Sequence, residues 1–188
     1  FGGAGLQATE MINAKGFLYL DEHHLDFPDR LWGVKDEARP LAVQIWDNDP
    51  ATLAAVGARL AQEFRVSVVD INFGCPVKKV VHRNGGSGCL RDLGLVERII
   101  RAVIGATHLP VTVKTRSGWN EDTRDPVGIA LRMQDAGARA FTLHARTRTQ
   151  MFGGRADWDE IARVVEALDI PVIGNGDTLN QSLEKAGR

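Results

Sequence analysis

The stretch VSVVDINFGCPVKKVVHRNGGSGCLR, which spans residues 66–91, decides the fold. Its first residues are mostly β-branched and apolar as far as Ile71, and Gly74, Cys75 and Pro76 follow soon after. A short apolar run closed by glycine and proline predicts a buried parallel strand that ends at the turn. Because α/β folds bind ligands at the carboxyl ends of such strands, Cys75 stands where a catalytic or binding side chain is expected.

The rest of this stretch adds positive charge and glycine. Lys78 and Lys79 follow the predicted turn, and the loop at residues 84–88 reads NGGSG. Glycine has no Cβ, so the backbone of such a loop can come close to a ligand. We therefore expect Cys75, the lysine pair and a flexible glycine loop to surround one active site, whereas Cys89 is expected to pack in the core.

The composition is that of an ordinary single domain. The chain has 188 residues, of which 44% are hydrophobic and 25% are charged, as in soluble globular proteins. Lys and Arg number 23 and Asp and Glu 24, and the net charge of −1 indicates no nucleic-acid surface beyond a local patch. No apolar run approaches the roughly 18 residues that a membrane span needs, so we expect no membrane partner. Two cysteines without a CxxC spacing indicate a reducing, cytoplasmic location.

Short apolar runs alternate with amphipathic segments, which is the pattern of βαβ units around a parallel sheet. Asp49-Pro50 and Asp125-Pro126 each place an N-cap residue before a first-turn proline and so predict helix starts. Residues 15–39 are predicted as a loop-rich connection that holds a short helix at most. Strands are expected at residues 6–12, 41–46, 66–73, 111–115, 140–145 and 172–174.

The helices between these strands should each bury one apolar stripe. The stripe of the first comprises Leu53, Val56, Leu60 and Phe64, and that of the second comprises Val96, Ile99, Ile100 and Val103. The third should bury Ile129, Ala130 and Met133. A helix that begins at Asp157 should bury Ile161, Val164, Val165 and Leu168, and another is expected to begin at Thr178.

Polar residues recur where the predicted strands end, which favours a (β/α)₈ TIM barrel. An open doubly wound sheet would place its phosphate-binding glycines after the first strand, whereas here glycines follow several strands. We expect residues 1–188 to form one partial barrel, because the chain starts at Phe1 and ends at Arg188 within a predicted helix. The polar strand-end residues are Gln44, Asn72, Cys75, Lys114, Arg116, His144, Arg146, Asn175 and Asp177.

Lys114 and Arg116 share one face of the strand at residues 111–115, because side chains alternate with a period of two. A buried ammonium is costly, so Lys114 indicates either an anionic ligand or a salt bridge to an acid such as Asp70 or Glu10. The residues alone leave Cys75 open as nucleophile or general acid, and His144 open between a core and a ligand role.

The turn Gly174–Asp177 adds a candidate phosphate site. Taken by itself, GNGD after a strand is a weak phosphate-loop signal, but in a barrel the loops after the seventh and eighth strands bind phosphate. No second histidine or cysteine stands at ligand spacing from His144, so no metal site is expected.

Taken in order, the motifs resemble the tRNA-dihydrouridine synthase family of FMN-dependent barrel enzymes. The resemblance covers almost the whole chain and places the family's first and eighth strands and its C-terminal helical RNA-binding domain outside it. The motifs are TEM (9–11), VQI (43–45), DINFGCPVKKV (70–80), GSGCL (86–90), VKTRSGW (113–119), LHARTRTQMFGGRADW (143–158) and IGNGD (173–177).

The resemblance implies roles for the candidate residues. Cys75 would be the general acid that protonates C5 of uracil while reduced FMN, regenerated by NADPH, gives hydride to C6. Asn72 and Arg116 would position the uridine of the tRNA, and Lys78 and Lys79 would meet RNA phosphates or remain a solvated pair. The flavin would be held by Gln44 and Lys114 at its ring system and by His144, Asn175, Gly176 and Asp177 at its ribityl phosphate.

Alternatives remain at this point. The nearest is another FMN barrel that reduces a free pyrimidine, in the manner of dihydropyrimidine or dihydroorotate dehydrogenases. The others are a non-catalytic RNA-binding scaffold that kept the barrel and a metal-dependent barrel hydrolase.

Overall fold

The computed structural model describes residues 5–23, 25, 34 and 37–177. A parallel sheet runs through them in the order β1-β3-β4-β5-β6-β7, and β2 also pairs with β3. Strand order follows chain order without the reversal of a doubly wound sheet, so the predicted class, an α/β partial (β/α)₈ barrel, is confirmed. The strands are β1 (Gln7–Ala8), β2 (Ile12–Asn13), β3 (Leu41–Trp46), β4 (Val68–Phe73), β5 (Val111–Arg116), β6 (Phe141–His144) and β7 (Val172–Asn175).

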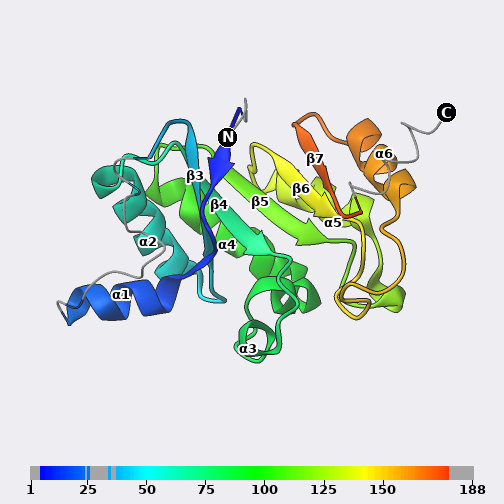
Figure 1. Cartoon of the computed structure of the whole chain (residues 1–188), viewed down its shortest axis with the longest axis horizontal. Coiled ribbons are helices and arrows are strands. Elements are labelled where there is room, and N and C mark those ends of the chain that lie inside the picture. The colour runs from blue at the N-terminus through cyan, green and yellow to red at the C-terminus, as the bar shows by residue number, and fades with distance from the viewer. Residues whose placement is uncertain (1–4, 24, 26–33, 35–36, 178–188) are drawn as a thin grey trace.

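Helices cover one face of this sheet. Figure 1 shows α1, α2, α4, α5 and α6 along its outer side, while α3 projects from the edge where the strands end. Asp49 and Asp125 cap their helices as predicted, by accepting from the backbone N–H of Thr52 and Gly128. The helices are α1 (Ala14–Glu22), α2 (Pro50–Glu63), α3 (Lys78–Val81), α4 (Leu93–Ala106), α5 (Pro126–Asp135) and α6 (Trp158–Ala167), with 3₁₀ turns η2 (Gly86–Arg91) and η3 (Glu121–Thr123).

The predicted apolar stripes of α2, α4 and α5 are buried throughout. The stripe of α6 is narrower than expected. Ile161 and Val164 are buried, but Val165 is 52% exposed, because the position after Val164 turns away from the sheet. Leu168 ends the helix and packs against the core while partly buried.

The structure divides one predicted strand and gives the bounds of a helix in the N-terminal connection. The strand expected at residues 6–12 is divided into β1 and β2, and between them the backbone N–H of Thr9 donates to Ala42 O at 3.0 Å. Within the connection predicted as loop-rich with a short helix at most, residues 14–22 form the nine-residue helix α1, and Phe17 is fully buried in the core. His24, Pro28 and the helix expected at Thr178 lie outside the described residues.

The two faces of the sheet carry different residues. On β4, Val69, Ile71 and Phe73 are fully buried in the core under the helices. Asp70 and Asn72 alternate with them and point to the opposite face, which becomes the interior in a closed barrel. This polar inner face holds the candidate site.

Within the described ranges, no helix is both long enough and apolar enough to cross a membrane.

Candidate active site

A chain of hydrogen bonds crosses the inner face from β5 to β3. The buried carboxylate of Asp70 accepts from Thr112 Oγ1 at 2.6 Å and from Gln44 Nε2 at 2.5 Å. Register explains the contact, because Asp70 lies opposite Gln44 on one neighbouring strand and opposite Thr112 on the other. Burial raises the pKa of Asp70, and these two donors partly offset that rise.

The chain continues to the turn that carries Cys75. Gln44 Oε1 accepts from Asn72 Nδ2 at 2.7 Å, and Asn72 Oδ1 accepts from the backbone N–H groups of Gly74 at 3.0 Å and Cys75 at 2.8 Å. An amide side chain has one accepting and one donating end. Because the Asp70 carboxylate accepts from Gln44, Gln44 turns its oxygen toward Asn72, and Asn72 then turns its oxygen toward the Cys75 turn.

Cys75 lies half-buried between β4 and α3, with its backbone held on both sides. Its carbonyl accepts from the backbone N–H of Ser87 at 3.1 Å and from Ser87 Oγ at 2.8 Å. Gly86 has φ +54°, and a Cβ there would lie only 2.8 Å from Cys75 O. The prediction that this glycine loop approaches a ligand stays a prediction. In the structure Gly86 and Gly88 lie in the buried turn η2, Gly85 is its N-cap, and Gly86 approaches the backbone of Cys75.

Lys114 extends across the inner face from β5 to β7. Its Nζ donates to Asn175 Oδ1 at 3.1 Å, whereas the Asp70 carboxylate bonds Gln44 and Thr112, so the alternative of a Lys114–Asp70 salt bridge is wrong. Burial and then the charge of Arg116 lower the pKa of Lys114. The ammonium thus occupies a site with surplus positive charge.

Arg116 is 2% exposed and joins two loops. Its Nε donates to Gly74 O at 2.9 Å, and its Nη1 donates to Met151 O at 2.7 Å and to Thr147 O at 3.1 Å. Burial, followed by the charge of Arg146, lowers the pKa of Arg116 to about 10, and a Cys75 thiolate would raise the pKa of both Lys114 and Arg116. The two cations therefore lie within electrostatic reach of the thiol.

His144 and Asp177 meet at Arg146. Arg146 Nη1 donates to His144 Nε2 at 3.1 Å, and its Nη2 donates to both oxygens of Asp177 at 2.9 and 2.8 Å. Burial, then the charges of Arg116, Lys114 and Arg146, lower the pKa of His144 to about 4, so the imidazole is neutral near pH 7. The N–H of Ala156 and then Arg146 lower the pKa of Asp177.

Gly176 fits a space that no side chain could occupy. Its φ is +109°, and a Cβ there would lie 2.9 Å from the Cβ of Ala156 and 3.3 Å from the ring of His144. Its carbonyl accepts from Trp158 Nε1 at 3.1 Å. The turn after β7 therefore lies directly on the His144 side of the site.

All the predicted site residues thus lie on one face and one edge of the sheet. One group contains Gln44, Asn72 and Cys75, and β-sheet register places Lys114 opposite Asn72, and His144 opposite both Arg116 and Asn175. Lys78 and Lys79 are exposed on α3, at the same edge. Cys89 is buried as predicted, and burial raises its pKa to about 12, so it remains a thiol.

Sequence reasoning missed three parts of this arrangement. Asp70 was considered only as an ion partner for Lys114, Arg146 was noted only as a polar strand-end residue, and Glu160 was not considered. Glu160 is 3% exposed and accepts from Ser117 Oγ and Arg124 Nε, both at 2.6 Å. For Glu160, the only signal in the sequence was an acidic residue in the helix predicted to begin at Asp157. Such a residue is a weak indication of a buried polar contact.

Among the described residues, no group of three or more His, Cys, Asp or Glu side chains is placed to hold a metal ion.

Comparison with known proteins identifies the family. A family model described as dihydrouridine synthase (Dus) matches residues 1–186. This chain belongs to the dihydrouridine synthase family. The resemblance found in the sequence motifs is therefore confirmed.

Curated relatives of the dihydrouridine synthase family match most of the chain. The chain is 42% identical over 169 residues to the probable tRNA-dihydrouridine synthase 1 of Synechocystis sp. strain PCC 6803, a match that covers 90% of the chain and 46% of that protein. It is 40% identical over 185 residues to tRNA-dihydrouridine synthase B of Pseudomonas aeruginosa, with 98% and 53% covered. The chain spans about half the length of the curated relatives it matches.

A solved structure supports the fold alone. The carboxyl transferase domain of Rhizobium etli pyruvate carboxylase, solved with 3-bromopyruvate, superposes with a TM-score of 0.53 at 13% sequence identity. That match covers 90% of this chain and 28% of the solved chain.

Proposed function

We propose that residues 1–188 are part of the catalytic barrel of an enzyme that reduces uridine to 5,6-dihydrouridine in tRNA, with FMN as cofactor and NADPH as reductant. Family membership and the names of the relatives support the reaction class. The single observation that carries the proposal is Cys75, fixed at a strand end by the Asp70–Gln44–Asn72 chain and within electrostatic reach of Lys114 and Arg116.

The charge of the inner face fits a flavin mononucleotide. Lys114, Arg116 and Arg146 lower one another's pKa values or that of His144, which means that positive charge is in excess there. Considering only the residues that the structure describes, Arg146 is the one of these three cations with a carboxylate partner, which is Asp177. A phosphate and an electron-rich ring system would supply the negative charge that this region lacks.

The cofactor would be held by residues from four strands. Gln44 has an N–H left after its bond to Asp70, and Lys114 offers N–H donors left after its bond to Asn175, so both suit the edge of the flavin ring. His144, Asn175, Gly176 and Asp177 would hold the ribityl-phosphate side. Asp177 would act there by orienting Arg146, because its own carboxylate would repel a phosphate. When bound, the flavin would supply the hydride that adds to C6 of the uracil.

Cys75 would deliver the proton that adds to C5, which completes the reduction of the C5–C6 double bond. A thiol carries a proton that it can donate in the transition state, as a general acid does. The fixed backbone of Cys75 limits where its Sγ can lie and so orients the proton transfer.

Asn72 and Arg116 would position the uridine. Both hold the Gly74–Cys75 turn, Asn72 through its oxygen and Arg116 through Nε. Among the described residues nothing accepts a hydrogen bond from Arg116 Nη2, so that group is left for an oxygen of the uracil or ribose. Lys78 and Lys79 would meet phosphates of the same tRNA strand, in the cytoplasm where unmodified tRNA is available.

The proposal is tested with the complete protein, purified without added cofactor. Absorbance and mass spectrometry of the released small molecule identify FMN, and unmodified tRNA and free uridine are then assayed separately for dihydrouridine formation with NADPH. Dihydrouridine in tRNA alone is the expected result. Reduction of the free pyrimidine alone would assign the site to an FMN barrel that acts on free pyrimidines. Absence of flavin would favour a non-catalytic RNA-binding scaffold.

A further inference from the structure

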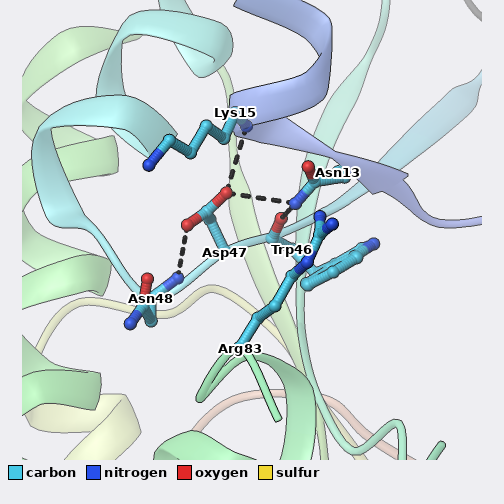
Figure 2. Close-up of a pocket in the computed structure, with 6 residues that line it drawn as sticks. All are labelled: Asn13, Lys15, Trp46, Asp47, Asn48 and Arg83. Carbon is cyan, nitrogen blue, oxygen red and sulfur yellow. Dashed lines mark hydrogen bonds between the residues drawn. The ribbon is translucent and has the colours of Figure 1, made fainter. Parts of the chain in front are cut away.

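A cavity of about 380 Å³ opens beside the proposed active site, at the edge where the strands end. Its walls come from the end of β2, the end of β3 and the turn that follows α3. The catalytic roles proposed above use none of these side chains. Figure 2 shows the residues that line it, which are Asn13, Lys15, Trp46, Asp47, Asn48 and Arg83.

The floor of the cavity is fixed by Asp47, which is 6% exposed. Its Oδ2 accepts from Asn13 Nδ2 at 3.1 Å and from the backbone N–H of Lys15 at 3.0 Å, and its Oδ1 accepts from the backbone N–H of Asn48 at 2.8 Å. Neutral, immobile donors therefore bind this carboxylate. The cationic side chains around it are not required for that purpose.

Lys15 and Arg83 are exposed and lie around Asp47 in Figure 2. The salt bridges in the described part of the chain pair arginines with acids, and two of those arginines are exposed, in Arg98–Asp92 and Arg132–Glu97. Neither Lys15 nor Arg83 has such a partner there. Two cations against one carboxylate leave the lining of the cavity net positive, which suits an anionic ligand.

The cavity and the active site share one wall. Gly85 packs on Trp46 so closely that a Cβ would lie 2.6 Å from the indole, and the next residue, Gly86, packs on Cys75 in the same way. Two consecutive residues span at most about 7 Å, so this short segment is all that separates the indole from the backbone of Cys75. A strand of RNA whose uridine reaches Cys75 would therefore place a neighbouring nucleotide at the cavity.

We propose that this cavity is a phosphodiester subsite for a nucleotide that flanks the target uridine. Lys15 and Arg83 bind the phosphate, and the largely buried Trp46 supports the wall between the cavity and the Cys75 turn. Phosphate contacts of this kind position a nucleic acid without reading its sequence. The inference rests on the proposed tRNA substrate and adds a binding site to it.

The test compares two variants of the complete protein. Lys15→Ala/Arg83→Ala removes both cations, and Arg101→Ala removes an exposed arginine on α4 that does not line the cavity. For the double variant we expect the Kd for unmodified tRNA to rise about tenfold and the slope of log Kd against log salt to fall by about 1. The rate at which NADPH reduces the enzyme should not change, and Arg101→Ala should match the wild type throughout.

Two results would overturn the subsite. One is a double variant that binds tRNA with the affinity and salt slope of the wild type. The other is an increase in the KM for NADPH with unchanged tRNA affinity, which would assign the cavity to a phosphate of the coenzyme. Failure of the proposed function looks different, because the wild-type protein itself would then neither bind nor reduce tRNA.

Discussion

Gln44 donates from Nε2 to the carboxylate of Asp70 at 2.5 Å, and this bond orients each amide between Asp70 and Cys75. Asp70 is buried, and its partners lie on strands to either side. A carboxylate offers acceptors only, so Gln44 and Asn72 each have one satisfactory orientation. The position of the Cys75 turn therefore depends on a residue that touches neither substrate nor cofactor in the proposed mechanism.

Asp70→Asn should disturb this chain with little change in side-chain volume. The new amide can present its N–H₂ group to Gln44, and Gln44 and Asn72 can then turn over. We expect kcat for tRNA reduction to fall by at least about tenfold, with a loss of about 1–3 kcal/mol in the free energy of unfolding. Thr112→Val removes the other donor to Asp70 but leaves Gln44 in place, so its kcat should fall less. Equal losses in the two variants would contradict the orienting role.

Lys114→Met should separate stability from activity. Burial and Arg116 lower the pKa of Lys114, so between its folded and unfolded pKa values the unfolded chain binds the proton more tightly. The charged ammonium thus weakens folding at neutral pH, and stability rises with pH across that window. Urea unfolding of Lys114→Met should give a free energy equal to that of the wild type or higher by about 1 kcal/mol, while flavin content and kcat fall. A loss of several kcal/mol would show that Lys114 is structural.

His144 should make the unfolding free energy depend on pH on the acidic side. Its pKa is about 4 in the folded protein against an ordinary value of 6.5. Between these values the unfolded chain holds the proton and the folded chain does not, so stability falls as the pH drops, by up to about 1.4 kcal/mol per pH unit. Urea midpoints between pH 4.5 and 7.5 should show this slope reduced in His144→Gln. If the unfolding free energy depended on pH in the same way in His144→Gln and in the wild type, the pH dependence would not come from His144.

Glu160→Ala should be destabilising, because it leaves Ser117 and Arg124 without their buried acceptor. Because Arg124 keeps its pairs with Glu121 and Asp157, we expect a loss of about 1–3 kcal/mol in the free energy of unfolding, mainly from the unpaired Ser117 hydroxyl. Glu97→Ala is the matched control, since it breaks the more exposed Arg132–Glu97 pair and should cost less than about 1 kcal/mol. Similar losses in the two variants would mean that burial does not strengthen the Glu160 contacts.

The sequence predicted those features of the fold that are determined locally. The strand ending near Phe73 and the capped starts of α2 and α5 follow from short apolar runs and from Asp-Pro pairs, which act within a few residues. The division of the first predicted strand into β1 and β2 did not follow from these local patterns. It depends on how Thr9 bonds to Ala42 and Gln44, more than thirty residues later in the chain.

The sequence predicted which residues form the site but not how their side chains contact one another. Polar strand-end residues could be named, because a period of two and the barrel class place them on one face. The orientation of the Gln44 and Asn72 amides depends on Asp70 and could not be read from spacing. Similarly, nothing local to Gly86 shows that it packs on Cys75, because its left-handed conformation fits a loop that faces either solvent or protein.

The role of Cys75 is tested most directly by the reoxidation of the reduced, flavin-loaded complete protein by unmodified tRNA, in wild type and in Cys75→Ala. We expect rapid reoxidation with dihydrouridine formation in the wild type. In Cys75→Ala we expect a rate at least about 100-fold lower, with the flavin content and tRNA affinity of the wild type. A Cys75→Ala protein that tRNA reoxidises at the wild-type rate would contradict the role of Cys75, and a wild-type protein that tRNA does not reoxidise would contradict the proposed function.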